Sequence, residues 1–324
     1  MHEYDIVKTR AGLFAMQHKS LVRLTGPDSG TLVERLLCGD VRRLPVGQER
    51  FSPMLNYQGG IMDAVQVLHP SPDRYWLIIN RSCREKDLRH IRREAEGDVE
   101  IFDLEDDVVL MLLLGPAASG FLNTQPAEGE LIVETDVCGV RCMTCRMPRL
   151  GVDGFFLVCA AAQEEQLISA MNAQNVPLCA PDVLDVFMLE AGMPSYGREM
   201  DDTLNPLETG LKSRVNINRP GFVGREALVA AGEPRRTLIG LTLSRFGAGY
   251  NMPLVHREKY VGYITSARYC PGIEGYAALA LIETPYQEVG RKLKVETPDG
   301  LIDAVVAKLP LQKDVSEEEK AQSS

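Results

Sequence analysis

The stretch Gly59-Gly60-Ile61-Met62-Asp63-Ala64 follows Phe51-Ser52-Pro53-Met54-Leu55-Asn56, with two residues between them. Its carboxylate, Asp63, has two interpretations. It caps the end of a strand by bonding to the backbone, or it points into a binding pocket. The segments on either side indicate what kind of fold surrounds it.

The flanking segments read as alternating strands and helices. Ser20–Thr25 predicts a strand, and the helix that follows ends at Gly39. Arg74–Asn80 is rich in aromatic and β-branched residues, which predicts a second strand. Ser82 and Glu85 then have the spacing of a capping box, in which each side chain satisfies a free backbone donor at the start of a helix.

The rest of the chain changes character near residue 236. Before it, the pattern predicts strands at Val108–Gly115, Leu131–Val140, Arg141–Met147 and Phe155–Cys159, a short helix at Pro116–Leu122, and helices at Glu164–Ala173 and Pro181–Ala191. After it, nearly every segment predicts a strand: Leu238–Leu243, Val261–Ser266, Ala277–Ile282, Leu293–Glu296 and Ile302–Lys308. That shift marks a domain boundary, and the polar tail Lys313–Ser324 is expected to be disordered.

Composition excludes several classes of protein. The net charge of −10 gives nucleic acid the wrong average field. The most apolar run, Val108–Leu114, is far shorter than the roughly 20 residues that cross a bilayer. Because the N-terminus has neither a basic nor an apolar signal region, we expect a cytoplasmic protein without membrane contact, whose eight cysteines stay reduced.

Generic catalytic and metal motifs do not occur in the sequence. The five histidines lack ligand spacing, so no metal site is predicted. Cys138, Cys142 and Cys145 have a spacing that can hold an iron–sulfur cluster. They lie in an expected β-hairpin, however, where Cys142 and Cys145 should point to opposite faces. Buried thiols that pack as small apolar groups are the alternative.

Further motifs precede and follow the opening stretch along the chain. They are Gly26-Pro27-Asp28, Gly39-Asp40-Val41, Leu189-Glu190-Ala191-Gly192-Met193-Pro194-Ser195-Tyr196-Gly197-Arg198-Glu199-Met200-Asp201, Asn205-Pro206-Leu207-Glu208, Gly221-Phe222-Val223-Gly224-Arg225-Glu226 and Gly262-Tyr263-Ile264-Thr265-Ser266-Ala267-Arg268. In order and spacing the chain resembles the aminomethyltransferase (T-protein) of the glycine cleavage system, from about residue 10 to residue 310.

The resemblance implies an α+β, three-domain, cloverleaf-like fold with antiparallel sheets and a C-terminal domain of β-barrel or jelly-roll type around a central funnel for tetrahydrofolate. The implied domains are residues 1–19 with 103–192, residues 20–102 with 193–236, and residues 237–312, followed by the tail 313–324.

The resemblance also implies a folate site, from which this chain departs. In the family, two consecutive aspartates end the glycine-glycine segment, and the second stabilises charge or takes a proton at the folate ring. Here the pair reads Asp63-Ala64. A glutamate that pairs with the pterin falls on Phe156, and a folate-facing arginine falls on Leu184. The implied pocket is more apolar than the family's.

The expected site therefore has Asp63 as its catalytic carboxylate and folate contacts at Met54, Asn80, Arg149, Phe156, Leu184 and Glu190. Several of these have plainer explanations. Asn80 can end its strand, Glu190 can form an internal ion pair with Arg198 or Arg214, and Phe156 and Leu184 can be core residues.

Two functions remain open from the sequence. The first is a tetrahydrofolate-dependent one-carbon transferase, either an aminomethyltransferase that works with the lipoyl-carrying H-protein or a methyltransferase or demethylase with another one-carbon donor. The second is a non-catalytic accessory protein that binds folate or another ligand on the same fold.

Overall fold

The computed structural model describes residues 2–41, 44–147 and 149–311. The chain divides into two compact units: Met1–Leu184 with Met200–Glu233, and Asp185–Glu199 with Pro234–Ser324. The expected tail lies outside the described residues. The helices are α1 (His2–Thr9), α2 (Ser29–Leu36), α3 (Arg84–Glu94), α4 (Glu164–Ala173), α5 (Pro181–Glu190) and α6 (Arg225–Ala231). No helix among the described residues is long and apolar enough to span a bilayer.

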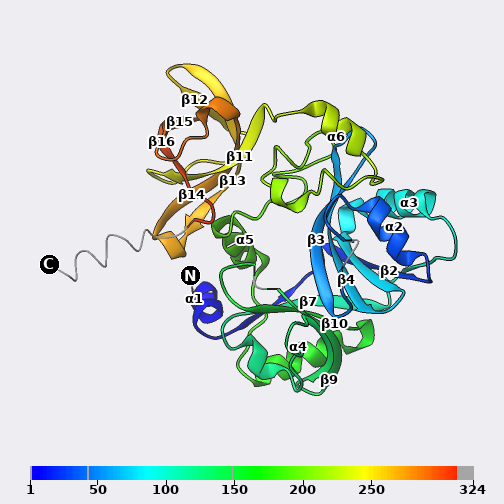
Figure 1. Ribbon diagram of the computed structural model, residues 1–324. Coiled ribbons are helices and arrows are strands. Elements are labelled where there is room, and N and C mark those ends of the chain that lie inside the picture. The colour runs from blue at the N-terminus through cyan, green and yellow to red at the C-terminus, as the bar shows by residue number, and fades with distance from the viewer. Residues whose placement is uncertain (1, 42–43, 148, 312–324) are drawn as a thin grey trace. The chain divides into compact units, whose positions relative to one another are not determined.

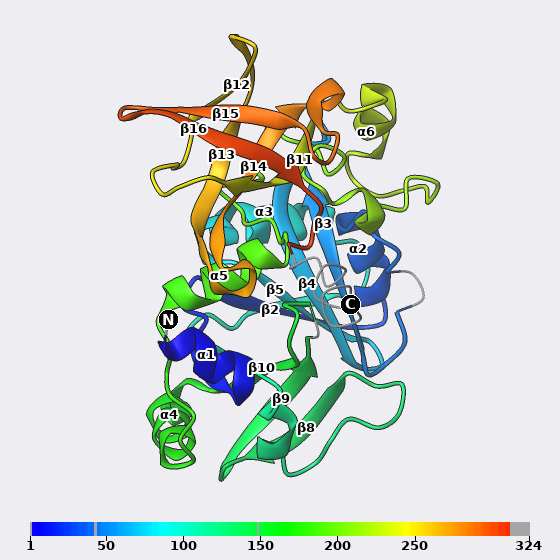
Figure 2. The ribbon, with the colours of Figure 1, turned by 90° about the vertical axis from the view of Figure 1, so that its left-hand side faces the viewer.

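The first unit contains two five-stranded antiparallel sheets (Figures 1 and 2). One has the order β1 (Gly12–Ala15), β7 (Val108–Leu114), β10 (Gly154–Ala160), β9 (Val140–Arg146) and β8 (Ile132–Val137). The other, which we call the α2/α3 sheet, has the order β3 (Gln48–Leu55), β4 (Ile61–Ser71), β5 (Arg74–Asn80), β2 (Lys19–Thr25) and β6 (Glu100–Asp103).

Helices α2 and α3 cover one face of the α2/α3 sheet, as both ribbon views show. Val65, Val67, Leu77 and Ile79 point to this face and join the helices in one buried cluster. Because side chains alternate along a strand, the residues between them point to the opposite face. Ala64 and Gln66 are therefore on the side away from α2 and α3, which we call the open face.

The second unit is built on a closed antiparallel barrel, which confirms the β-rich C-terminal region. Its order is β11 (Arg236–Leu243), β14 (Gly275–Glu283), β13 (Lys259–Cys270), β12 (Pro253–His256), β15 (Lys292–Thr297) and β16 (Gly300–Ala307). Closure pairs the edge strands with one another. The sequence did not reveal β12, a four-residue strand that starts at Pro253.

Two local expectations were wrong. The Ser82–Glu85 capping box does not form, because a 3₁₀ turn at Arg81–Cys83 precedes α3 and no side chain caps either element. The expected helix at Pro116–Leu122 is a single 3₁₀ turn, Ala118–Phe121.

The cysteine hairpin behaves as its alternation predicts. Cys142 belongs to the buried cluster beneath α4, whereas Cys145 is on the other face of β9, opposite Phe156 of β10. Cys145, which burial keeps as a thiol by raising its pKa, lies close enough to Glu49 and Arg149 to feel their charges. This geometry favours packed thiols over a cluster of ligands.

Candidate functional site

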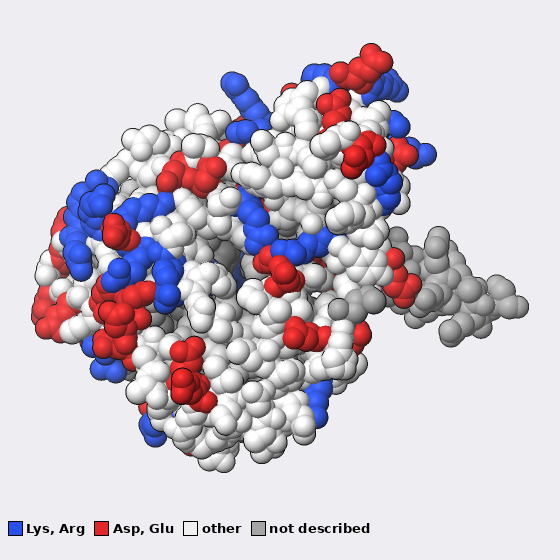
Figure 3. All heavy atoms as spheres, turned by 180° about the vertical axis from the view of Figure 1, so that it is seen from behind, with Lys and Arg blue, Asp and Glu red and all other residues white. Residues whose placement is uncertain are grey.

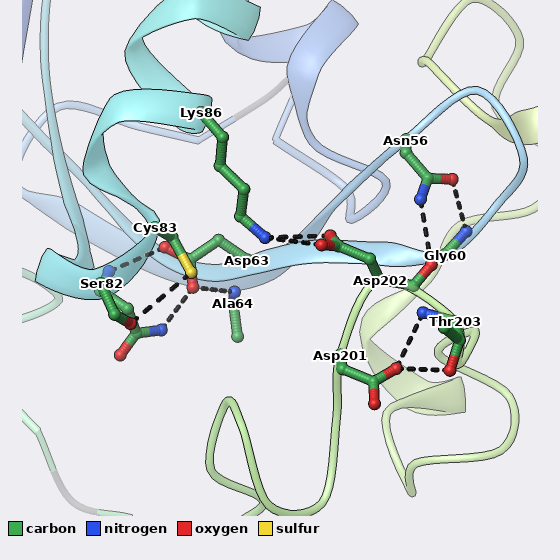
Figure 4. Close-up of polar contacts among 11 residues, drawn as sticks. Asn56, Gly60, Asp63, Ala64, Ser82, Cys83, Lys86, Asp201, Asp202 and Thr203 are labelled. Atoms are coloured by element: carbon green, nitrogen blue, oxygen red, sulfur yellow. Dashed lines mark hydrogen bonds and ion pairs between the residues drawn. The ribbon is translucent and has the colours of Figure 1, made fainter.

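Asp63 lies at the centre of a buried hydrogen-bond network in the first unit. Its side chain is fully buried, and one carboxylate oxygen, Oδ1, accepts hydrogen bonds from the Ala64 backbone N–H at 2.7 Å and from the Asn80 side-chain amide. The other oxygen, Oδ2, accepts the Asn80 backbone N–H at 2.7 Å. The carboxylate thus holds the end of β5 against β4 (Figure 4). These contacts fit both interpretations of Asp63, as a residue that fastens the end of a strand and as a residue of a pocket, because they also fix the backbone beside Ala64.

Asp87 and Cys83 lie next to Asp63 on the side of α3. Each of these three residues has a side-chain oxygen or sulfur atom that could bind a metal ion, and these atoms lie within 4.8 Å of one another. Within the described residues, neither oxygen of Asp87 receives a hydrogen bond from a donor group. Burial, and then the nearby charge of Asp63, raise the pKa of Asp87 to about 10. Asp87 therefore keeps its proton at neutral pH beside the Asp63 side chain.

Lys19 is a charged group of this site that sequence analysis missed. It is the first residue of β2 and lies directly opposite Asn80 on β5. Its Nζ donates a hydrogen bond of 2.7 Å to Asn80 Oδ1. The predicted strand began one residue later, at Ser20, which left Lys19 outside it. The useful signal would have been its cross-strand position relative to Asn80, which only the register reveals.

The glycine pair beside Asp63 is explained by close packing. A Cβ at Gly60 would lie 1.8 Å from the backbone oxygen of Asp202, so only glycine fits there. The Asn56 side chain accepts the Gly60 N–H at 2.9 Å and donates to the same Asp202 oxygen at 3.1 Å. Lys86 of α3 also bonds the Asp202 carboxylate, at 2.9 and 3.0 Å (Figure 4). Two motifs far apart in sequence thus meet at one place in the first unit.

Arg149 lies over the open face of the α2/α3 sheet. It donates to the Gln66 side-chain oxygen at 2.7 Å and forms an ion pair with Glu49. Its guanidinium also lies 5.5 Å from the centre of the Phe51 ring. Gln66 is two residues from Ala64 on the same strand face. Arg149 and Ala64 are thereby on one side of this sheet.

The other expected contact residues are buried in different surroundings. Met54 is fully buried in the cluster beneath α2 and α3. Phe156 and Leu184 are 7% and 5% exposed, consistent with core positions as well as with the walls of a pocket. Their contact with a ligand stays a prediction.

Glu190 belongs to the second unit. One of its carboxylate oxygens accepts the Gly272 N–H at 2.9 Å, and its backbone oxygen accepts the Leu311 N–H at 2.7 Å. Arg198, one partner expected for Glu190, pairs with Asp185, which also pairs with Arg268. Burial acts to raise the pKa of Asp185, but these two arginines outweigh it and hold that pKa below its usual range.

Surface features are separate from the Asp63 network. A hollow on the first unit is lined by Arg84, Glu85, Leu88, Arg89, Arg92 and Asp103, none of which belongs to the network. On the face drawn in Figure 3, described Lys and Arg side chains lie interspersed with Asp and Glu.

Replacing Asp87 by Asn tests the protonation state of the pair. An acid whose pKa is raised on folding destabilises the fold progressively as pH rises from its unfolded value, 3.8, to its folded value, about 10. In wild-type protein the unfolding free energy should therefore fall by up to about 1.4 kcal/mol for each pH unit in this range. The Asp87→Asn protein should not show this decrease. Urea titrations followed by Trp76 fluorescence between pH 5 and 9 measure it. An unchanged slope would show that Asp87 is ionised in the folded protein.

Comparison with known families accounts for nearly the whole chain. The model of the GCVT N-terminal domain matches residues 1–219, and that of the glycine cleavage T-protein C-terminal barrel domain matches residues 236–313. The chain belongs to the glycine cleavage T-protein family. The resemblance found in the sequence motifs is thereby confirmed.

Individual members of this family match over almost their full length. The chain is 31% identical to an aminomethyltransferase of Synechococcus sp., with 96% of this chain and 89% of that protein covered. It is 30% identical to an aminomethyltransferase of Bacillus subtilis, with 96% and 90% covered. The crystal structure of glycine cleavage system aminomethyltransferase T from Bartonella henselae superposes with a TM-score of 0.87 at 24% identity, covering 96% of this chain and 90% of that one. That likeness confirms the fold.

Proposed function

We propose that this chain is a tetrahydrofolate-dependent one-carbon transferase related to the glycine cleavage aminomethyltransferase. The observation that carries the proposal is the ordered network of Asp63 and Asn80, which holds Ala64 in place beside a buried carboxylate. Its setting is a chain that matches named aminomethyltransferases over 96% of its length.

The residues of the candidate site in the first unit each have a proposed role in this reaction. Asn80, Arg149, Phe156 and Leu184 would contact the folate, and Arg149 offers guanidinium donors to its carbonyl or carboxylate groups. Asp63 lies directly beside Ala64, whose N–H donates a hydrogen bond to its carboxylate. It would stabilise positive charge that develops on the one-carbon unit during transfer. Met54 lies in the buried cluster beneath α2 and α3, away from the open face, and Glu190 belongs to the second unit, so their folate contacts stay predictions outside this proposal.

Ala64, Phe156 and Leu184 shape the choice of donor. At these three positions this chain has apolar side chains where the family resemblance implies charged groups. A pocket with fewer charges stabilises an ammonium or a cationic transition state less well. A donor that carries a methyl group needs less such stabilisation, so we propose that an N-methyl donor suits this site better than the aminomethyl group of a lipoyl H-protein.

A binding protein without catalytic activity is the second candidate. Ala64 favours it, because a side chain without a carboxylate cannot take the proton that transfer releases. The two candidates predict the same folate affinity and differ in turnover. Two assays separate them: aminomethyl-loaded H-protein followed by 5,10-methylenetetrahydrofolate formation, and N-methyl amino acids followed by methyltetrahydrofolate formation.

Tetrahydrofolate binding is the first expected result. Calorimetry should show binding to one site per chain at submillimolar folate, and Asn80→Ala should weaken it about tenfold, the effect of roughly 1.4 kcal/mol. Lys294→Met, on the surface of the barrel, is the matched control and should leave affinity unchanged. The proposal fails if wild-type protein shows no heat of binding at millimolar tetrahydrofolate.

A further inference from the structure

Lys19 sits where the open face of the α2/α3 sheet meets the Asp63 network. Its ammonium is bonded to Asn80 Oδ1, Asn80 is bonded to Asp63, and Asp63 is bonded to the Ala64 N–H. Three contacts therefore connect Lys19 to the position that lacks a carboxylate. β5 pairs with β4 through Ile78 and Gln66, and continuing that register by two residues brings Asn80 opposite Ala64. Lys19, opposite Asn80 on the other side, points to the same face.

Few charged groups compensate the Lys19 ammonium. Asp63 of β4 is the main group whose charge favours the protonated lysine. Burial raises the pKa of the Cys83 thiol, just before α3, to about 11, so it is uncharged at neutral pH, and Asp87 behind them keeps its own proton. Although the side chain as a whole is half-buried, the loss of water around its ammonium dominates and lowers the pKa of Lys19 below its usual value of 10.5. Lysines placed in this way serve as proton acceptors in enzymes.

We propose that Lys19 is the proton acceptor of the one-carbon transfer and fills the role that Ala64 cannot. This assignment rests on the proposed function, because it requires a folate amine at the open face. The choice of Lys19 follows from its position: it hydrogen-bonds to Asn80, as Asp63 does, but it points to the face shared with Ala64, whereas Asp63 precedes Ala64 on β4 and alternates with it.

The step conserves atoms and electrons. For the proposed N-methyl donor, an amine nitrogen of tetrahydrofolate attacks the methyl carbon with its lone pair, an N–C bond forms, and the bond between that carbon and the donor nitrogen breaks, so that methyltetrahydrofolate is the product. The proton of the attacking amine passes to the neutral amine of Lys19, which becomes an ammonium. Lys19 then returns the proton to the departing group, and no oxidation or reduction takes place.

A positive charge alone would be a different role with a different signature. A cation at Lys19 would hold an anionic or carbonyl group of the ligand and would be replaceable by arginine. A proton acceptor is not, because arginine stays protonated. Lys19→Met and Lys19→Arg therefore distinguish the two roles, and Lys294→Met again serves as the control.

The expected result is a loss of turnover without loss of binding. Lys19→Met and Lys19→Arg should both lower kcat by about 10²–10⁴-fold, the usual contribution of a positioned acid–base group. The folate Kd from calorimetry should be unchanged in Lys19→Met. In wild-type protein kcat should rise with pH through the lowered pKa of Lys19, because only the neutral amine accepts a proton, and this rise should vanish in both variants.

Labelling gives a readout that needs no turnover. Acetic anhydride should modify Lys19 in the free protein, and saturating tetrahydrofolate should protect it, while Lys294 is labelled equally in both states, as mass spectrometry of peptides shows. If Lys19→Arg retains wild-type kcat, or if bound folate leaves the labelling of Lys19 unchanged, the assignment is wrong although folate binding stands. If wild-type protein binds no folate, the proposed function fails and the assignment fails with it.

Discussion

Replacing Asp63 by Ala should lower the free energy of unfolding of the first unit by roughly 3–5 kcal/mol. The substitution removes one carboxylate and leaves three buried donors without an acceptor: the Ala64 N–H, the Asn80 N–H and the Asn80 amide. Each buried donor left unpaired costs about 1–3 kcal/mol. A typical domain is stable by only about 5–15 kcal/mol, so this is a large fraction of the total.

Trp76 makes the measurement possible, because it is the single tryptophan and lies on β5, the strand that ends at Asn80. Urea unfolding followed by its fluorescence reports on the first unit. Glu134→Ala is the matched control: it removes a carboxylate that pairs with Arg141 on the exposed surface of the same unit and should cost less than about 1 kcal/mol. Equal losses in the two variants would contradict the proposed importance of the buried network.

Sequence patterns were sufficient where packing repeats along a strand or helix. The strand Arg74–Asn80 has the predicted limits, and α4 begins and ends where the pattern placed it. The β-rich region after residue 236 became a closed barrel. In these segments apolar periodicity alone decides the local structure, because one buried face repeats regularly.

Patterns failed where a contact depends on residues far apart in sequence. The capping box at Ser82 was predicted from local spacing alone. In the structure a 3₁₀ turn carries the chain from β5 into α3 instead. Gly60 is required by the backbone of Asp202, which sits about 140 positions further along, so local spacing carried no sign of that clash.

The residues of the candidate site also divide into those that local patterns predicted and those that they missed. Asp63 and Asn80 were expected in it, and the structure joins them directly. Lys19 and Asp87 were not, because their significance depends on the register of β2 with β5 and on the face that α3 covers. A sequence shows that apolar and polar residues alternate along a strand. The helices that cover the sheet determine which of these residues are exposed to water and which lie next to a buried carboxylate.

Restoring the family's carboxylate by Ala64→Asp should raise kcat in only one of two backgrounds. In wild-type protein the new carboxylate would lie on the open face near Lys19 and keep that lysine protonated, because an opposite charge favours the charged form. Turnover at neutral pH should then fall or stay level. In the Lys19→Met background the carboxylate can itself accept the proton, and kcat should recover by about 10²-fold.

The four proteins of this cycle measure the interaction between the two side chains. Groups that act on one proton should show a coupling of about 1–3 kcal/mol in the barrier, whereas independent groups give values near zero. Ala64→Asn in the Lys19→Met background controls for added volume at this position, which is 4% exposed, and should give no recovery because an amide takes no proton. Both the N-methyl donors and aminomethyl-loaded H-protein should be assayed. A gain from Ala64→Asp that is equal in both backgrounds would mean that Lys19 and residue 64 serve different steps.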